Sequence, residues 1–225
     1  MLSAVKWYFE LKNLSLRNAM SIRCPLQPGK QKDLRQYYSQ YFSGLLSATE
    51  LLLESEYEHR AAFKSSLEEA LSFGGDFDGT RSYAYLRELR NSVIHRGLDL
   101  CSGAHIQEDF PVYVAPSPVT NRSGTASYLA FGRYLIEVIQ KCETVVGKVF
   151  LNHFQQFGLL SVRLSDADMS QEIRQFIENS SIIPENIKAP AIEAVLGMNH
   201  EELHQQSVAL LLQELNEDVL AEYFA

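Results

Sequence analysis

The chain has 225 residues, of which 46% are hydrophobic, and this composition is typical of a globular protein rather than of a disordered chain. Its formal net charge of −8 excludes attraction of nucleic acid through the overall electrostatic field, so contact with RNA would require a local basic cluster. The longest apolar runs are far shorter than the ~20 residues of a membrane-spanning helix, and the first residues do not form a secretory signal. We therefore expect a cytoplasmic protein without a membrane partner.

Cysteine and histidine spacing gives little sign of a metal or cofactor. Cys24, Cys101 and Cys142 are far apart and form no C-x-x-C pair, which is typical of reduced thiols. His200 and His204 are four residues apart on an expected helix, a spacing that could hold a metal, but no third ligand follows them. We expect no cofactor and favour a solvated helix face there, with a metal enzyme as an alternative.

Apolar residues at three- and four-residue spacing predict a largely helical chain. The expected helices span 1–20, 32–58, 60–72, 80–96, 126–150, 168–179, 184–196 and 200–224. Thr80 or Ser82 is expected to cap the fourth helix, and Gly97 to end it. Residues 98–125 contain three prolines and a short β-like stretch over 111–114, which indicates a functional or inserted connection.

The sequence changes in character after Gly158, where aromatic residues become scarce and Glu and Gln become frequent. We predict an all-α fold in two parts. Residues 1–155 form an antiparallel helical bundle, and residues 156–225 form a C-terminal helical appendage.

Arg90 falls on the apolar face of the helix expected over 80–96. A guanidinium in that place is costly unless a carboxylate pairs with it. The expected partners lie on the long second helix, at Glu50, Glu54 or Glu56. Two interpretations stay open: an ion pair within one chain joins the two helices, or this face meets a second copy of the chain.

The next face of the same helix carries Asn91 and His95, which are neighbours one turn apart. Four arginines form the local basic cluster that RNA binding would require: Arg81, Arg87, Arg90 and Arg96. Of these, Arg87 and Arg96 are the candidates for substrate binding.

The string Arg90-Asn91-Ser92-Val93-Ile94-His95 resembles the signature of the HEPN superfamily, in which an Arg and a His stand a few residues apart and a polar residue often follows the Arg. The expected helix order over 1–155 is also similar to the bundle of that family. The resemblance implies a metal-independent endoribonuclease of the toxin–antitoxin or antiviral-defence kind. It also implies a homodimer with a composite active site, with an antitoxin or regulatory protein as a further partner.

The resemblance implies roles for individual residues. His95 acts as acid and base on the 2′-hydroxyl of RNA, Arg90 stabilises the phosphate, and Asn91 orients His95 or contacts the phosphate. Glu50 and Glu54 support Arg90. The alternative is a non-catalytic HEPN-like interaction module that binds a partner protein or nucleotide, which the acidic charge and the C-terminal extension favour.

Overall fold

The computed structural model describes residues 1–107, 109–161, 166–180, 182–196 and 199–224. They form two compact units, the first from Met1–His153 with Leu211–Ala225 and the second from Phe154–Leu210. The described helices are α1 (Leu2–Met20), α2 (Pro28–Leu53), α3 (Arg60–Ala70), α4 (Gly79–Arg96), α5 (Leu135–Gln156), the 3-10 helix η1 (Leu159–Ser161), α6 (Asp166–Asn179), α7 (Glu185–Leu196), α8 (His200–Asn216) and α9 (Ala221–Phe224). The fold is therefore mainly α.

The fold is not purely helical, because two short antiparallel hairpins lie between α4 and α5. Their strands are β1 (Ala104–Gln107), β2 (Phe110–Tyr113), β3 (Val119–Thr120) and β4 (Ser127–Tyr128). Strand β1 pairs with β2, with Ala104 opposite Tyr113, and β3 pairs with β4, with Val119 opposite Tyr128. The β-like character expected over 111–114 corresponds to β2, and the expectation of an all-α chain is corrected to this extent.

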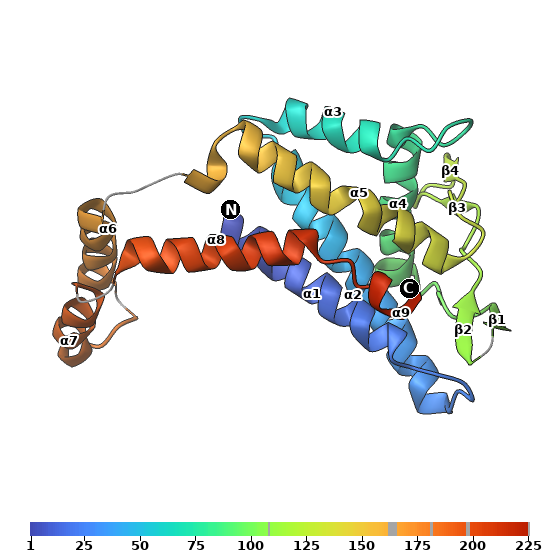
Figure 1. Ribbon diagram of the computed structural model, residues 1–225, viewed down its shortest axis with the longest axis horizontal. Helices are drawn as coiled ribbons and strands as arrows, with labels where there is room; N and C mark the ends of the chain where they lie inside the picture. Colours follow the sequence, from blue (N-terminus) through green and yellow to red (C-terminus); the bar gives the residue numbers. More distant parts are fainter. Residues whose placement is uncertain (108, 162–165, 181, 197–198, 225) are drawn as a thin grey trace. The chain divides into compact units, whose positions relative to one another are not determined.

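The first unit has an apolar core between its long helices. Helices α1 and α2 lie side by side, the axis of α5 has a similar tilt with the chain running opposite to α1, and α4 crosses them (Figure 1). Each helix contributes the apolar face that its residue spacing predicts. Fully buried core residues include Val5, Phe9, Leu16, Leu34, Tyr41, Leu45, Leu52, Phe63, Leu67, Tyr85, Leu89, Val138, Ile139 and Phe150.

A polar network also lies inside this core. The Lys12 ammonium donates to both carboxylate oxygens of Glu143, at 2.8 and 2.9 Å, and to the side-chain oxygen of Asn13 at 2.6 Å. The Tyr41 hydroxyl donates to Glu143 at 2.8 Å, and the Asn13 amide donates to the Glu214 carboxylate at 2.7 Å. Because each buried charge has partners, the network is tolerated, and it joins α1, α2, α5 and the end of α8.

Two boundaries differ clearly from the sequence-based expectation. Helix α2 ends at Leu53, five residues before 58, and α5 begins at Leu135 rather than near 126. The Glu137 carboxylate accepts hydrogen bonds from the backbone N–H groups of Arg133, at 2.7 Å, and Tyr134, at 3.3 Å, and this fixes the start of α5. The residues just before it have the spacing of a helix but instead form β4 and a bend.

The C-terminal region divides between the two units. Helices α6 and α7 pack against each other in the second unit. Leu211–Ala225 belong with the first unit, although they were predicted to be part of the appendage over 156–225. The last expected helix is split into α8 and α9.

None of the helices in the described part of the chain is both long enough and apolar enough to cross a membrane.

Candidate functional site

Helix α4 carries the Arg90–His95 motif and is fixed at both ends. Asp78, rather than the expected Thr80 or Ser82, is the N-cap, and its carboxylate accepts the backbone N–H of Arg81 at 2.8 Å. Gly97 ends the helix in the left-handed conformation, with φ of 71°, as expected. The N–H of Leu98 then bonds to the Ser92 carbonyl at 3.0 Å, closing the helix end.

The start of α4 is pressed against α3 at Gly79. A Cβ atom at this position would lie 1.6 Å from the carbonyl oxygen of Glu68, so only glycine permits this approach. The position of α4 against α3 therefore depends on close backbone packing at its first residue.

Arg90 forms an ion pair with Glu50 on α2. The two terminal nitrogens of its guanidinium donate to the two oxygens of the Glu50 carboxylate at 2.9 and 2.7 Å, a bidentate arrangement. The Arg90 side chain is 17% exposed, and its Nε atom is buried without a hydrogen-bond partner. Glu50 is thus the carboxylate opposite Arg90, while Glu54 makes no ion pair with Arg90 among the described residues.

The exposed side of α4 carries His95 and Asn91. The His95 imidazole is exposed and makes no hydrogen bond or ion pair within the described ranges. The Asn91 amide lies 3.5 Å from the Glu88 carboxylate. Ile94 is 49% exposed, and the buried face of α4 includes Ser92.

The four arginines of the predicted basic cluster have different surroundings. Arg81 pairs with Asp78 at 3.5 Å. The guanidinium of Arg96 donates to the Ser92 hydroxyl and to the Thr120 carbonyl of β3, and it lies 3.5 Å from the Glu88 carboxylate. With Arg90 held by Glu50, Arg87 is the one member of the cluster without an ion pair among the described side chains.

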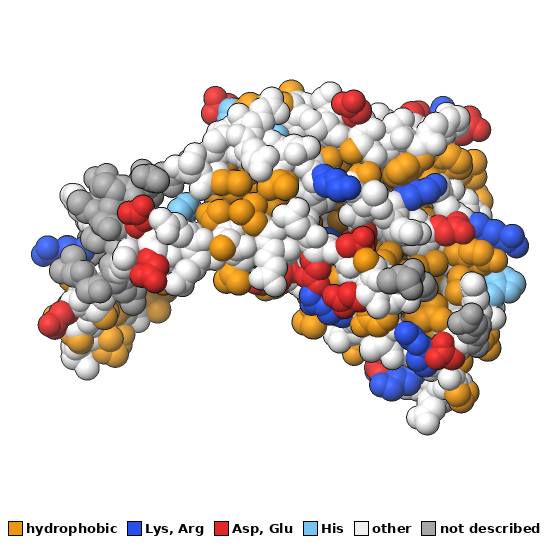
Figure 2. Space-filling view, in the orientation of Figure 1, with side chains coloured by type: hydrophobic (Ala, Val, Ile, Leu, Met, Phe, Trp, Pro, Cys, Tyr) orange, Lys and Arg blue, Asp and Glu red, His pale blue; other side chains and the backbone are white. Residues whose placement is uncertain are grey.

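Figure 2 shows acidic and basic side chains lying close to one another on the visible face of the first unit, rather than in separate patches. A mixed surface of this kind does not attract a polyanion over long distances. Binding of any polyanion would therefore depend on which cations are left without an internal partner.

One pocket adjoins the motif helix. It has a volume of about 460 Å³ and lies between the end of α2, the face of α3 and the first turns of α4. Its lining residues are Glu50, Leu53, Glu54, Arg60, Lys64, Glu68, Thr80, Tyr83, Ala84 and Arg87. We call it the α2–α4 pocket.

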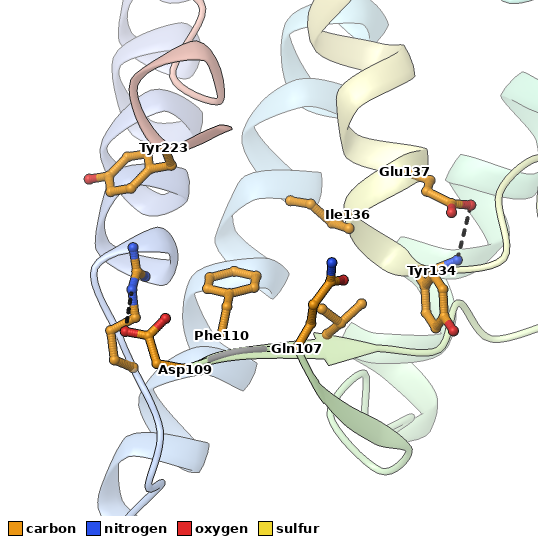
Figure 3. Close-up of a pocket in the computed structure, with 9 residues that line it drawn as sticks. Gln107, Asp109, Phe110, Tyr134, Ile136, Glu137 and Tyr223 are labelled. Atoms are coloured by element: carbon orange, nitrogen blue, oxygen red, sulfur yellow. Dashed lines mark hydrogen bonds and ion pairs between the residues drawn. The ribbon is translucent and has the colours of Figure 1, made fainter. Parts of the chain in front are cut away.

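A second pocket, of about 440 Å³, lies beside the first hairpin (Figure 3). Phe110, Ile136 and Gln107 point into it, and Tyr223 of α9 stands at one side. The guanidinium of Arg23 lies 5.3 Å from the centre of the Phe110 ring and 5.8 Å from that of Tyr223, so these cation–π contacts hold α9 in place. None of the motif residues lines this pocket.

The metal alternative gains no support from the described residues. The side chain of His200 lies outside what the structure describes, and the described residues contain no group of three or more His, Cys, Asp or Glu that could hold a metal. The Cys101 thiol is buried, and burial raises its pKa to about 12, so it is not a reactive nucleophile.

Residues beyond those predicted from the sequence also lie at this site. Glu88 contacts both Asn91 and Arg96, and Arg60 and Tyr83 line the α2–α4 pocket with Arg87. Tyr83 and Arg87 stand one turn apart on α4, which was readable from the sequence. The approach of Arg60 from α3 was not, because it depends on how two helices pack.

Comparisons with protein-family models, with curated proteins and with solved structures return no match for this chain.

Proposed function

We propose that this protein is a metal-independent endoribonuclease of the HEPN type that cleaves RNA at the Arg90–His95 motif. The observation that carries the proposal is that one helix presents both an exposed His95, without an internal partner among the described residues, and an Arg90 that Glu50 holds in a fixed orientation. Imidazole is suited to proton transfer near neutral pH, and guanidinium is suited to a phosphate. The toxin or antiviral-defence role belongs to the same proposal.

In the proposed reaction His95 accepts the proton of a ribose 2′-hydroxyl. The 2′-oxygen forms a bond to phosphorus while the bond from phosphorus to the 5′-oxygen breaks, and the 5′-oxygen takes up a proton. The products are a 2′,3′-cyclic phosphate and a 5′-hydroxyl, and no water is consumed. Arg90 stabilises the negative charge that builds up on the phosphate oxygens.

The ion pair with Glu50 favours a site completed by a second copy. Glu50 offsets the charge of Arg90 and takes two of its five N–H donors, so a single motif offers a phosphate little net positive charge. Two motifs facing each other supply two guanidinium groups and two imidazoles, one to accept the 2′ proton and one to protonate the 5′-oxygen. Exposed Ile94, next to His95, provides apolar surface for such a homodimer.

The test is cleavage of a single-stranded RNA by the purified protein in EDTA. We expect cleavage with a 2′,3′-cyclic phosphate end, and loss of cleavage in His95→Ala. A single 2′-deoxy substitution at the cleaved nucleotide should block the reaction, because it removes the nucleophile. His105→Ala, at an exposed histidine on β1, is the matched control and should keep full activity. Cleavage by the His95→Ala protein would refute the proposal.

The second candidate is a non-catalytic interaction module. The Glu50–Arg90 ion pair favours it, because joining α2 to α4 is by itself enough to explain why an arginine lies at position 90. In that case Arg90→Ala lowers thermal stability, and no cleavage of RNA is detected in any variant. Wild-type melting of Arg90→Ala would count against this candidate.

A further inference from the structure

The α2–α4 pocket is continuous with the proposed cleavage motif through two residues. Glu50 lines the pocket and also holds Arg90. Arg87 lines the pocket and stands one helical turn before Asn91 and two turns before His95, on the same exposed face of α4. An RNA strand with a phosphate at His95 that continues along this face of α4 therefore reaches Arg87 and then the pocket.

Two guanidinium groups at this pocket are available for an anion. Arg60 comes from the first residue of α3 and Arg87 from α4, so they line the pocket from two different helices. Both side chains are exposed, and neither makes an ion pair with any described residue. Lys64 lies 3.8 Å from Glu68, a loose contact. Arginine binds phosphate in a bidentate manner, so each of these two residues is suited to a phosphate group at the pocket.

The lining of the pocket also includes an aromatic ring, that of Tyr83, which is held by a hydrogen bond. The Tyr83 hydroxyl shares a hydrogen bond of 3.0 Å with the Thr49 hydroxyl, which is buried in α2. Burial raises the pKa of Tyr83, so its phenol is neutral at physiological pH. Leu53 and Ala84 add apolar surface beside the ring. A fixed, neutral aromatic side chain of this kind is a platform on which a nucleobase stacks.

A free acceptor completes the lining. Glu54 is the exposed C-cap residue of α2, and it makes no ion pair with the residues that the structure describes. Its carboxylate suits the N–H groups on the edge of a base. The pocket thus combines phosphate donors, a stacking surface and a base-edge acceptor in about 460 Å³.

We propose that the α2–α4 pocket binds one nucleotide of single-stranded RNA, adjacent to the phosphate that is cleaved. Arg60 and Arg87 hold its phosphate, Tyr83 stacks on its base, and Glu54 accepts a hydrogen bond from the base edge. A base can enter the pocket only when it is unstacked and unpaired, so the substrate is single-stranded. This inference rests on the proposed ribonuclease function, which places RNA at His95.

The experiment measures binding without cleavage. A fluorescently labelled, fully 2′-O-methylated single-stranded RNA of mixed sequence is titrated with the protein at fixed salt, and its anisotropy is recorded. We expect Arg60→Ala and Arg87→Ala each to weaken binding about tenfold. Lys148→Ala is the charge-matched control, because Lys148 is an exposed cation on α5 outside the pocket, and it should change affinity by less than about twofold.

The stacking step is tested at Tyr83. Tyr83→Ala should weaken binding at least about fivefold, whereas Tyr83→Phe keeps the ring and should bind within about twofold of wild type. The melting temperature of each variant is measured first, so that a loss of binding is read only from folded protein. A duplex of the same sequence should bind more weakly than the single strand.

The outcomes separate this inference from the proposed function. Equal affinities for Arg60→Ala, Arg87→Ala and Lys148→Ala would overturn the pocket as a nucleotide site, even if unmodified RNA is cleaved in a His95-dependent manner. Equal or tighter binding of the duplex would overturn the single-strand preference. If no variant or wild type ever cleaves RNA while the arginine and tyrosine variants lose binding, cleavage at His95 is refuted and the nucleotide site stands.

Discussion

Replacement of Glu50 by Gln tests the interaction on which both candidate functions depend. The change keeps the size of the side chain but removes the charge that faces Arg90. Arg90 then keeps an ionised guanidinium that is 17% exposed, with its Nε already lacking a partner. The Glu50 side chain is 38% exposed, so the pair is neither fully buried nor a surface pair.

The size of the effect follows from that intermediate burial. Removing one partner of a fully buried pair costs about 3–5 kcal/mol, whereas exposed pairs contribute roughly 0–1 kcal/mol. We expect Glu50→Gln to lower the free energy of unfolding by about 2 kcal/mol, which corresponds to roughly 4–8 °C in Tm for a chain of this size. Glu54→Gln, at the next turn of the chain and without an ion pair to Arg90, is the control and should melt close to wild type.

The assay is thermal unfolding followed by circular dichroism at pH 7, with Arg90→Met and the double variant completing a double-mutant cycle. A coupling energy of about 1–2 kcal/mol between positions 50 and 90 is expected, since each single variant leaves one charged or polar group without its partner. Glu50→Gln melting within about 1 °C of wild type, or additive single effects, would refute the reasoning.

Three further substitutions probe the framework around the site. Lys12→Met leaves a buried carboxylate without its cation and should cost about 3–5 kcal/mol in urea unfolding, so an unchanged midpoint would contradict the core ion pair. Burial lowers the pKa of His153 in the folded protein, so on acidification the unfolded chain takes up a proton at this histidine before the folded protein does. The Tm should therefore fall as the pH drops from about 6.5 through the lower folded pKa, and in His153→Gln the Tm should depend less on pH over this range. Gly79→Ala places a methyl group 1.6 Å from the Glu68 carbonyl oxygen and should destabilise by about 2 kcal/mol or more, whereas Gly29→Ala, with nothing within 4 Å, should not.

Local sequence patterns predicted much of the helical framework. The apolar period located the helices, and Gly97 ended α4 where expected, because both signals act within a few residues. The carboxylate opposite Arg90 was also predictable as one of three candidates, since a guanidinium on an apolar face needs a partner. The start of α5 was not predictable, because the hairpin β3–β4 competes with the helix for residues that have helical spacing.

Which arginines have internal partners could be determined only from the tertiary structure. Arg96 is held by Thr120, which is 24 residues away in sequence, while Arg87 makes no ion pair among the described residues although it lies in the same cluster. The α2–α4 pocket depends on three helices meeting at once, and helix period says nothing about where separate helices meet. Packing between residues distant in sequence thus determines which cationic side chains can bind a ligand.

The contact between Asn13 and Glu214 joins residues 201 positions apart. During synthesis α1 is made early, and Asn13 is buried in the folded unit. Its amide can donate to the Glu214 carboxylate only after the whole Phe154–Leu210 unit has been synthesised. Closing so long a loop is slow and entropically costly. The first unit is therefore expected to finish folding only after Leu211–Ala225 have been synthesised, so a site built on that unit is completed later than the helix α4 that carries its motif.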